Sequence, residues 1–289
     1  MIDSLVTSRG TDLVGTRAAG FDLIRCIVDR RMTGVFEGVR GSERAAVKIY
    51  YPSWISHSAR DEREDLAQRQ ISHPCVARAL ATDRLPDGSL VLASEWIEGE
   101  TLEARLARGP LPWPSVVPIL RDIARGLGAI HAARIVHRDI KPSNVLVPAT
   151  GSPSAVIVDF GHVYVIDEAR LTATGVVLGS AHYMAPEQAQ GHAIDHRVDL
   201  YAVGVILYRI LAGCLPFDHA SPAEVMRMHQ QEPVPPPHTR THCDVSPAAE
   251  DLCLWLLAKD PAHRVPNAHV LRATLEVLER PVHPVQATA

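Results

Sequence analysis

The chain has 289 residues, of which 46% are hydrophobic and 21% are charged, and its formal net charge is −4. This length is sufficient for one unit of two lobes, each with its own core, and is too short for a second sizeable domain beside it. The weakly acidic balance gives no electrostatic basis for binding nucleic acid. The 5 cysteines form no C-x-x-C pair, which favours a reducing, cytoplasmic location over a disulfide framework.

The N-terminal third of the chain predicts short strands and one helix. Residues 1–20 are polar and aperiodic, so we expect a flexible lead-in without a signal peptide. Residues 21–51 contain short β-branched runs around a glycine-containing turn, a pattern that predicts a β-hairpin. Residues 59–71 combine many charged side chains with a few apolar ones and predict an amphipathic helix. Two further strands are expected over 76–82 and 89–96.

Beyond Gly99 the spacing of apolar residues becomes helical and remains so. Residues 114–132 place apolar side chains three and four positions apart, which is typical of a helix packed against a core. Four later helices are expected over 199–211, 222–231, 247–257 and 268–279. The most apolar segment, 200–217, contains Arg209 and is too short to predict a membrane span.

The order of these elements predicts an α+β fold with two lobes. A small N-terminal lobe over 21–98 is expected to contain the antiparallel sheet and one helix. A larger, mainly α-helical lobe is expected over 99–280, followed by a flexible tail over 281–289.

Three polar motifs follow one another in the helical part of the chain. They read His137-Arg138-Asp139-Ile140-Lys141-Pro142-Ser143-Asn144, Asp159-Phe160-Gly161 and Ala185-Pro186-Glu187. Together they resemble the catalytic segment of a protein kinase, and Lys141 is typical of the serine/threonine class. The resemblance extends over residues 21–280 and includes the bacterial, eukaryotic-like (Hanks-type) serine/threonine kinases. It implies a bilobal kinase fold and Mg²⁺-dependent transfer of the γ-phosphate of ATP to serine or threonine hydroxyls of a protein.

The resemblance implies a separate role for each polar residue of these motifs. Asp139 is expected to orient the attacking hydroxyl and accept its proton, and Lys141 to lie beside the transferred phosphate. Asn144 and Asp159 offer the hard oxygen ligands that Mg²⁺ prefers. Supporting roles are implied for Arg138, Ser180, Glu187, Asp199 and Arg264.

Two of these supporting roles are specific contacts. Asp199 is expected to brace the catalytic loop from the start of a helix. Arg264 is expected to form a buried ion pair with Glu187, and such a pair is costly to break from one side.

The N-terminal lobe is expected to hold ATP. Lys48, in the run Ala46-Val47-Lys48, matches the lysine that contacts the α- and β-phosphates and pairs with a glutamate of the predicted helix. Glu64 is the favoured glutamate because of its distance from His73-Pro74, and Glu62 is the alternative. The residues expected around the nucleotide are Val28, Val35, Ala46, Lys48, Ser94, Glu95, Ile97 and Leu146.

One part of the family pattern is missing. A glycine-rich loop should precede Val35, but Val28, Arg30 and Thr33 stand where its three glycines belong. Glycine suits that loop because main-chain amides must approach phosphate oxygens closely. The departure supports an alternative function, a pseudokinase that acts as a nucleotide-binding scaffold with weakened turnover. A small-molecule kinase of related fold is a further alternative, which the Ala185-Pro186-Glu187 motif disfavours.

Residues 159–187 resemble a kinase activation loop. Thr172 and Thr174 resemble the threonines that bacterial kinases autophosphorylate, which implies self-association of the chain. A phosphate on either residue would add negative charge, and Arg138 is placed to pair with it.

Overall fold

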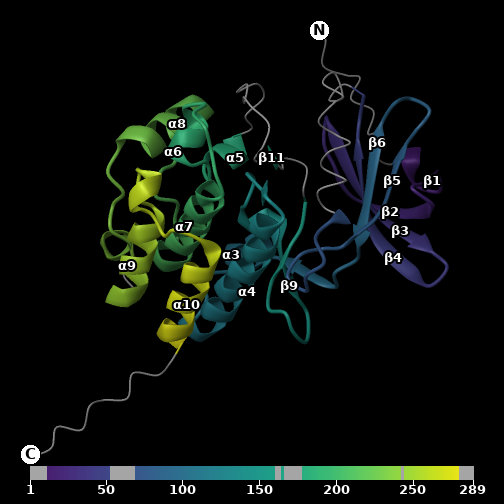
Figure 1. Ribbon diagram of the computed structural model, residues 1–289. Helices are drawn as coiled ribbons and strands as arrows, with labels where there is room; N and C mark the ends of the chain where they lie inside the picture. The colour runs from purple at the N-terminus through teal and green to yellow at the C-terminus, as the bar shows by residue number, and fades with distance from the viewer. Residues whose placement is uncertain (1–11, 53–68, 160–163, 166–177, 242–243, 280–289) are drawn as a thin grey trace, which may run out of the picture. The chain divides into compact units, whose positions relative to one another are not determined.

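The computed structural model describes residues 12–52, 69–159, 164–165, 178–241 and 244–279. The chain divides into two compact units, Met1–Glu98 and Gly99–Ala289 (Figure 1). The first unit is built on an antiparallel sheet and the second is mainly helical, which confirms the predicted α+β fold.

A six-stranded antiparallel sheet with the strand order β1-β2-β3-β4-β6-β5 forms the first unit. The strands are β1 (Arg17–Ala18), β2 (Phe21–Asp29), β3 (Thr33–Arg40), β4 (Glu43–Tyr50), β5 (Ala79–Arg84) and β6 (Leu90–Glu95). Successive side chains along a strand point to opposite faces of the sheet. One face therefore gathers the apolar core of the unit, which includes Phe21, Leu23, Phe36, Val47 and Ile49.

The expected flexible lead-in over residues 1–20 is wrong for the part that the structure describes. Within it, β1 pairs with β2, and Ala18 lies opposite Phe21. Ala18 and Ala19 are buried against the sheet core. Two small side chains in a polar segment give no periodic apolar signal, and the sequence pattern therefore did not predict this strand.

Helices form most of the second unit. They are α3 (Leu102–Ala107), α4 (Trp113–Ala132), α5 (Leu178–Ala181), α6 (Pro186–Ala189), α7 (Arg197–Ala212), α8 (Pro222–Gln231), α9 (Pro247–Leu256) and α10 (Ala268–Glu279), with short 3₁₀ turns η1 (Pro142–Asn144), η2 (Pro237–Arg240) and η3 (Pro261–His263). The predicted helices of this part of the chain agree closely with α4, α7, α8, α9 and α10. The short helix α3 was not predicted.

Short strands connect the helices of the second unit. β7 (Gly99–Thr101), β9 (Val145–Pro148) and β10 (Val156–Ile157) form a three-stranded sheet, and β8 (Ile135–Val136) pairs with β11 (Tyr164–Val165). Residues 137–141 follow β8 and lead into η1, and Asp159 lies in the turn that follows β10.

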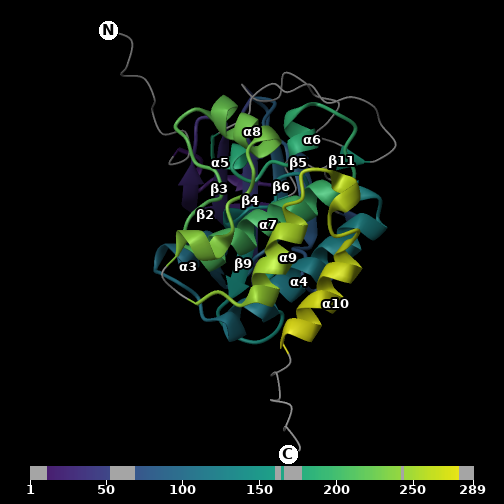
Figure 2. The same cartoon turned by 90° about the vertical axis from the view of Figure 1, so that its left-hand side faces the viewer.

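The helix α7 is buried on almost every side. It packs against α4 and α9, and α10 lies alongside α4 (Figure 2). A helix that is apolar around its whole circumference belongs in the core of a domain. The residues of its first turn are therefore held in fixed positions. None of the helices in the described ranges is long and apolar enough to cross a membrane.

Candidate active site

A buried aspartate holds the backbone of the loop that follows β8. Asp199, in the first turn of α7, accepts hydrogen bonds from the backbone N–H of His137 at 2.9 Å and of Arg138 at 2.8 Å. His131 Nε2, at the end of α4, lies 2.8 Å from the same carboxylate. Burial alone would raise the pKa of Asp199, but His131 and the N–H donors hold this pKa below its ordinary value. The carboxylate is therefore ionised at neutral pH and fixes the loop.

The loop backbone is held in an uncommon conformation at Arg138. Its φ is 65°, in the left-handed region that a residue with a side chain seldom adopts. Asp199 binds the N–H of Arg138, and Gln188 Nε2 donates to its carbonyl at 3.1 Å. Both backbone groups thus have partners that stabilise the strained conformation. Gln188 was not among the expected site residues, although it directly follows the Ala-Pro-Glu motif.

Asp139 is the centre of a hydrogen-bonded cluster. Lys141 Nζ donates to Asp139 Oδ2 at 2.6 Å, and Asn144 Nδ2 donates to the same oxygen at 2.9 Å. Asn144 Nδ2 also binds the Asp139 carbonyl at 2.8 Å, and Lys141 Nζ reaches Ser180 Oγ at 3.0 Å. Because Lys141 and Asn144 both donate to Oδ2, the other carboxylate oxygen, Oδ1, points away from them. The fold thus brings four expected site residues together.

Asp159 lies in the turn that follows β10, the last strand of the three-stranded sheet along the chain. The N–H of Val158 donates to the carbonyl of Asn144 at 2.9 Å, which joins the turn after β10 to η1. Asp159 itself has a φ of 66°, again in the left-handed region. Strained backbone of this kind occurs preferentially at functional sites.

His137 is a fully buried imidazole among acidic side chains. Burial lowers its pKa, although the negative charges of Asp199, Asp139 and Asp159 act in the opposite direction. The ring is therefore neutral at physiological pH and does not act as a charged partner.

Glu187 and Arg264 form a buried ion pair. Arg264 Nη1 and Nη2 donate to the two carboxylate oxygens at 2.8 Å and 3.1 Å. The remaining guanidinium N–H groups donate to the carbonyls of Arg197, Ala258 and Lys259. The side chain of Arg264 is 0% exposed, so this satisfied network is shielded from water. It anchors the start of α6 to the residue that directly follows η3.

In the first unit, strand pairing places five of the residues expected around the nucleotide on one face of the sheet. Val35 lies opposite Val28 on one side and Lys48 on the other, and Ala46 lies opposite Ser94. Residues that face each other across strands, or stand two apart along one, share a face of the sheet. These five side chains therefore occupy the face opposite the apolar core.

Lys48 is half-buried on this face. Its ammonium nitrogen lies 4.7 Å from the centre of the Tyr50 ring. Glu95 ends β6, and Ile97 follows it before the boundary of the unit. Leu146 belongs to β9 of the second unit.

The segment where the glycine-rich loop was expected forms a tight turn between β2 and β3. The N–H of Arg30 donates to the carbonyl of Thr33 at 2.9 Å, and the side chains of Arg30 and Arg31 are exposed. Val28 is 38% exposed at the end of β2. The turn therefore presents arginine side chains where a glycine loop would present only backbone.

Several expected residues lie outside the described part of the chain. They are Glu62, Glu64, Phe160, Gly161, Thr172 and Thr174. The helix expected over 59–71 also falls almost entirely outside it.

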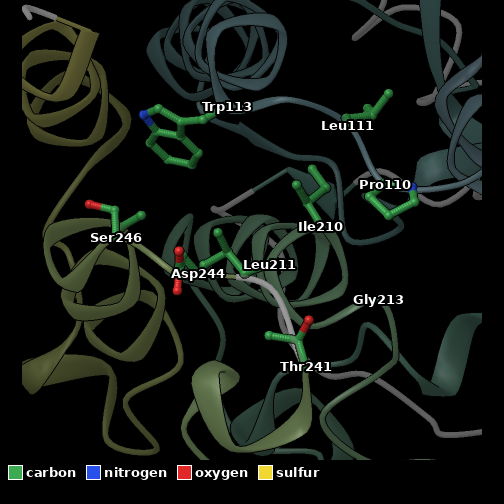
Figure 3. Close-up of a pocket in the computed structure, with 10 residues that line it drawn as sticks. Pro110, Leu111, Trp113, Ile210, Leu211, Gly213, Thr241, Asp244 and Ser246 are labelled. Carbon is green, nitrogen blue, oxygen red and sulfur yellow. The ribbon is translucent and has the colours of Figure 1, made fainter.

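A separate pocket of about 260 Å³ lies in the second unit (Figure 3). Trp113 at the start of α4, Ile210 and Leu211 near the end of α7, and Asp244 before α9 contribute to its lining. In the view of Figure 3, Leu211 lies beside Asp244, and Ile210 lies on the side of Pro110 and Leu111. None of the residues of the Asp139 cluster lines this pocket.

The sheet unit, the helical unit and the Asp139 loop braced by Asp199 are the features of a protein kinase domain. A family model described as "Protein kinase domain" matches residues 32–275 of this chain. The chain belongs to the protein kinase family.

Individual relatives are bacterial serine/threonine kinases. The chain is 39% identical to serine/threonine-protein kinase pkn3 of Myxococcus xanthus over 230 residues, which cover 77% of this chain and 42% of that protein. It is 36% identical to Pkn1 of the same organism over 92% of this chain and 39% of that protein. It is 31% identical to PrkC of Bacillus subtilis over 91% of this chain and 41% of that protein. The chain thus spans less than half the length of these curated relatives.

Proposed function

We propose that this chain catalyses Mg²⁺-dependent transfer of the γ-phosphate of ATP to serine or threonine hydroxyls of a protein substrate. The observation that carries the proposal is the cluster in which Lys141 and Asn144 bind one oxygen of Asp139 while Ser180 binds Lys141. Membership of the protein kinase family, with relatives named as serine/threonine kinases, supports the same reaction.

The chemistry requires a base, a cation and fixed geometry. The substrate hydroxyl oxygen forms a bond to the γ-phosphorus, and the bond from that phosphorus to the β,γ-bridging oxygen breaks, so that ADP leaves. Asp139 orients the hydroxyl and accepts its proton through Oδ1, the carboxylate oxygen to which Lys141 and Asn144 do not donate. Lys141 provides positive charge beside the transferred phosphoryl group, where negative charge is spread over three oxygens.

The donor set beside Asp139 fits a magnesium ion. The Asn144 amide nitrogen donates to Asp139, so the side-chain oxygen of the same amide is the atom that would bind the ion. Asp159 adds a carboxylate in the neighbouring turn. Carboxylate and amide oxygens are the hard ligands that Mg²⁺ prefers. When bound, the ion neutralises charge on the nucleotide phosphates. Asn144 and Asp159 would hold it.

The first unit is assigned to ATP binding. Lys48 would contact the α- and β-phosphates, and Glu64 would pair with it. Val28, Val35 and Ala46 would contact the adenine ring, with backbone groups of Glu95 and Ile97 at its polar edge. The resemblance to kinases adds Leu146, from the second unit, to the residues assigned to this ring. The common sheet face of Val28, Val35, Ala46 and Lys48 supports this assignment.

Ser94 is expected to leave space behind the adenine ring. Its hydroxyl donates to the Ala46 carbonyl at 3.4 Å, and the side chain is small. We expect the wild type to accept ATP analogues with bulky N6 substituents, whereas Ser94→Met should accept ATP and exclude them. Competition of the analogue with ATP measures this difference. Equal exclusion of the analogue by both proteins would contradict the assignment of Ser94.

A pseudokinase is the second candidate, and the β2–β3 turn favours it. Arg30 and Thr33 occupy positions where a kinase normally has glycine, and side chains there hold the backbone away from phosphate oxygens. The complete Asp139 cluster favours turnover instead, because a scaffold has no use for a fixed base and lysine.

Regulation is part of the same proposal. Thr172 and Thr174 are assigned as autophosphorylation sites, with Arg138 as the partner of the added phosphate. Transfer between two copies requires self-association. Action in the cytoplasm on a protein substrate fits the composition and the scattered cysteines.

Incubation of the purified chain with γ-labelled ATP and a protein substrate tests the proposed function. We expect label on the protein with Mg²⁺ and none when EDTA removes the metal. A raised melting temperature with ATP and Mg²⁺ but no label would support the pseudokinase instead. Transfer that proceeds equally with EDTA would contradict the assignment of Asn144 and Asp159.

A further inference from the structure

The turn between β2 and β3 is held by Tyr51, the residue that directly follows β4. Its backbone N–H donates to the Met32 carbonyl at 2.9 Å, and its hydroxyl donates to Asp29 Oδ1 at 3.0 Å. The Tyr51 side chain is buried in the apolar core of the sheet. The turn is therefore tied to the end of β4 through one backbone contact and one side-chain contact.

Gly34 is the only glycine of residues 28–35, and it makes room for this tyrosine. A Cβ atom at residue 34 would lie 2.6 Å from the Tyr51 hydroxyl oxygen and 2.7 Å from Cε2 of Phe36. A close-packed core does not accommodate contacts that short. The packing of the core thus explains Gly34 without a ligand, and the turn beside it presents side chains.

Arg30 lies on the opposite face of the sheet, the face of Lys48. Val28 pairs with Val35, and the N–H of Arg30 donates to the Thr33 carbonyl at 2.9 Å, so the pairing continues one step beyond β2. Residues two apart along a strand share a face, which places Arg30 with Val28 and Val35. Val35 lies opposite Lys48. The Arg30 side chain is exposed, and no described residue forms a hydrogen bond or an ion pair with its guanidinium group.

The order of residues along this face indicates which part of a nucleotide Arg30 can reach. Ala46, Lys48 and Tyr50 follow one another along β4, about 7 Å apart, and Thr33 lies opposite Tyr50. The adenine ring is assigned to Ala46, and the α- and β-phosphates are assigned to Lys48. A nucleotide that lies in this direction has its terminal phosphate one step further, at the level of Thr33 and Arg30.

We propose that Arg30 binds the terminal phosphate of ATP through its guanidinium group, and that Tyr51 positions the turn that carries it. A guanidinium group can donate two parallel hydrogen bonds to phosphate oxygens, so it replaces the backbone amides of a glycine loop with a charged contact. The inference rests on the proposed ATP-binding function. It makes Arg30 the residue that distinguishes ATP from ADP, because ADP has no phosphate at this level.

Isothermal titration calorimetry of the purified chain with ATP and with ADP, each with Mg²⁺, tests the proposal. Arg30→Gln should raise Kd for ATP about tenfold, the usual effect of losing a charge-assisted hydrogen bond, and change Kd for ADP by less than about twofold. Arg30→Lys keeps the charge but not the paired donors, and should raise Kd for ATP only about threefold.

Arg31→Gln is the matched control. Arg31 is the next residue, is also exposed and belongs to the tip of the turn rather than to the paired strands. Its loss removes the same charge and should leave both Kd values within about twofold of the wild type. Equal weakening of ATP binding in Arg30→Gln and Arg31→Gln would reveal a general attraction to positive charge and would overturn the specific contact.

Tyr51→Phe tests the positioning role, because it removes only the hydroxyl that binds Asp29. The amides of Arg30 and Tyr51 should exchange hydrogen faster than in the wild type, and at the wild-type rate in Arg31→Gln. Kd for ATP should rise about threefold, while Kd for ADP stays unchanged. Wild-type exchange and wild-type ATP affinity in Tyr51→Phe would contradict the role of Tyr51.

Binding is measured without phosphoryl transfer, so the two proposals can fail separately. An unchanged ratio of the ATP and ADP affinities in Arg30→Gln would overturn the role of Arg30 and leave the proposed kinase function standing. The expected loss of ATP affinity in a chain that transfers no phosphate would support the Arg30 contact and contradict the proposed transfer. A wild type that binds neither nucleotide would contradict both.

Discussion

Arg264→Ala is expected to lower the free energy of unfolding by about 3–5 kcal/mol, because it leaves the buried carboxylate of Glu187 without its cation. The arginine side chain is 0% exposed, so water cannot replace the lost hydrogen bonds without opening the structure. The carbonyls of Arg197, Ala258 and Lys259 would lose their donors as well. Urea unfolding measures the change.

The control for this prediction is Arg272→Ala on α10. Arg272 lies 3.6 Å from Glu276 and is partly exposed, so its loss should cost about 1 kcal/mol or less. The apolar double variant Arg264→Met with Glu187→Met should recover part of the lost stability, since no unpaired charge remains buried. Equal losses for Arg264→Ala and Arg272→Ala would show that the buried pair does not stabilise the fold. The affinity for ATP should change little in either variant.

Asp139→Asn is expected to lower kcat for phosphoryl transfer by about 10²–10⁴-fold, the usual contribution of a positioned base. The amide has the shape of the carboxylate, so Lys141 and Asn144 retain an oxygen to bind. It cannot accept the proton of the substrate hydroxyl at neutral pH. The stabilisation of the folded chain by ATP and Mg²⁺ should remain, because nucleotide binding is assigned to other residues.

The matched control is Asp251→Asn, which removes an exposed carboxylate from α9 by the same substitution. It should leave kcat unchanged. A kcat for Asp139→Asn within a factor of two or three of the wild type would exclude Asp139 as the base.

Periodicity was sufficient to predict the long helices but not the short elements. The apolar spacing of residues 114–132 predicts α4 because a long amphipathic helix repeats its signal over several turns. The helix α3 has only six residues, and its clearest local signal is Thr101, whose hydroxyl oxygen accepts a hydrogen bond from the Ala104 N–H. β1 depends on the small residues Ala18 and Ala19, which carry no periodic signal.

The motif residues could be named from the sequence because the order and spacing of their motifs resemble those of protein kinases. Asp139, Lys141 and Asn144 lie within one loop, and their contacts follow from that loop alone. His131 and Gln188 could not be found in this way, since each reaches the loop from a distant element.

The same reason applies to the turn between β2 and β3. Tyr51 reaches Asp29 from the end of β4, and only the folded chain brings them together. Arg30 is visible in the sequence, but its place on one face of the sheet depends on the register of the strands. The catalytic, nucleotide-binding, metal-binding and phosphorylation roles of the predicted site residues, including Asp139, Lys48, Glu64, Thr172 and Thr174, remain predictions.

The most direct test of the central claim is the identification of phosphorylated residues by mass spectrometry after incubation with ATP, Mg²⁺ and a protein substrate. We expect phosphoserine or phosphothreonine on the substrate with the wild type, and neither with Asp139→Asn over the same time. Equal phosphorylation by both proteins, or none by the wild type at any concentration of ATP, would contradict it.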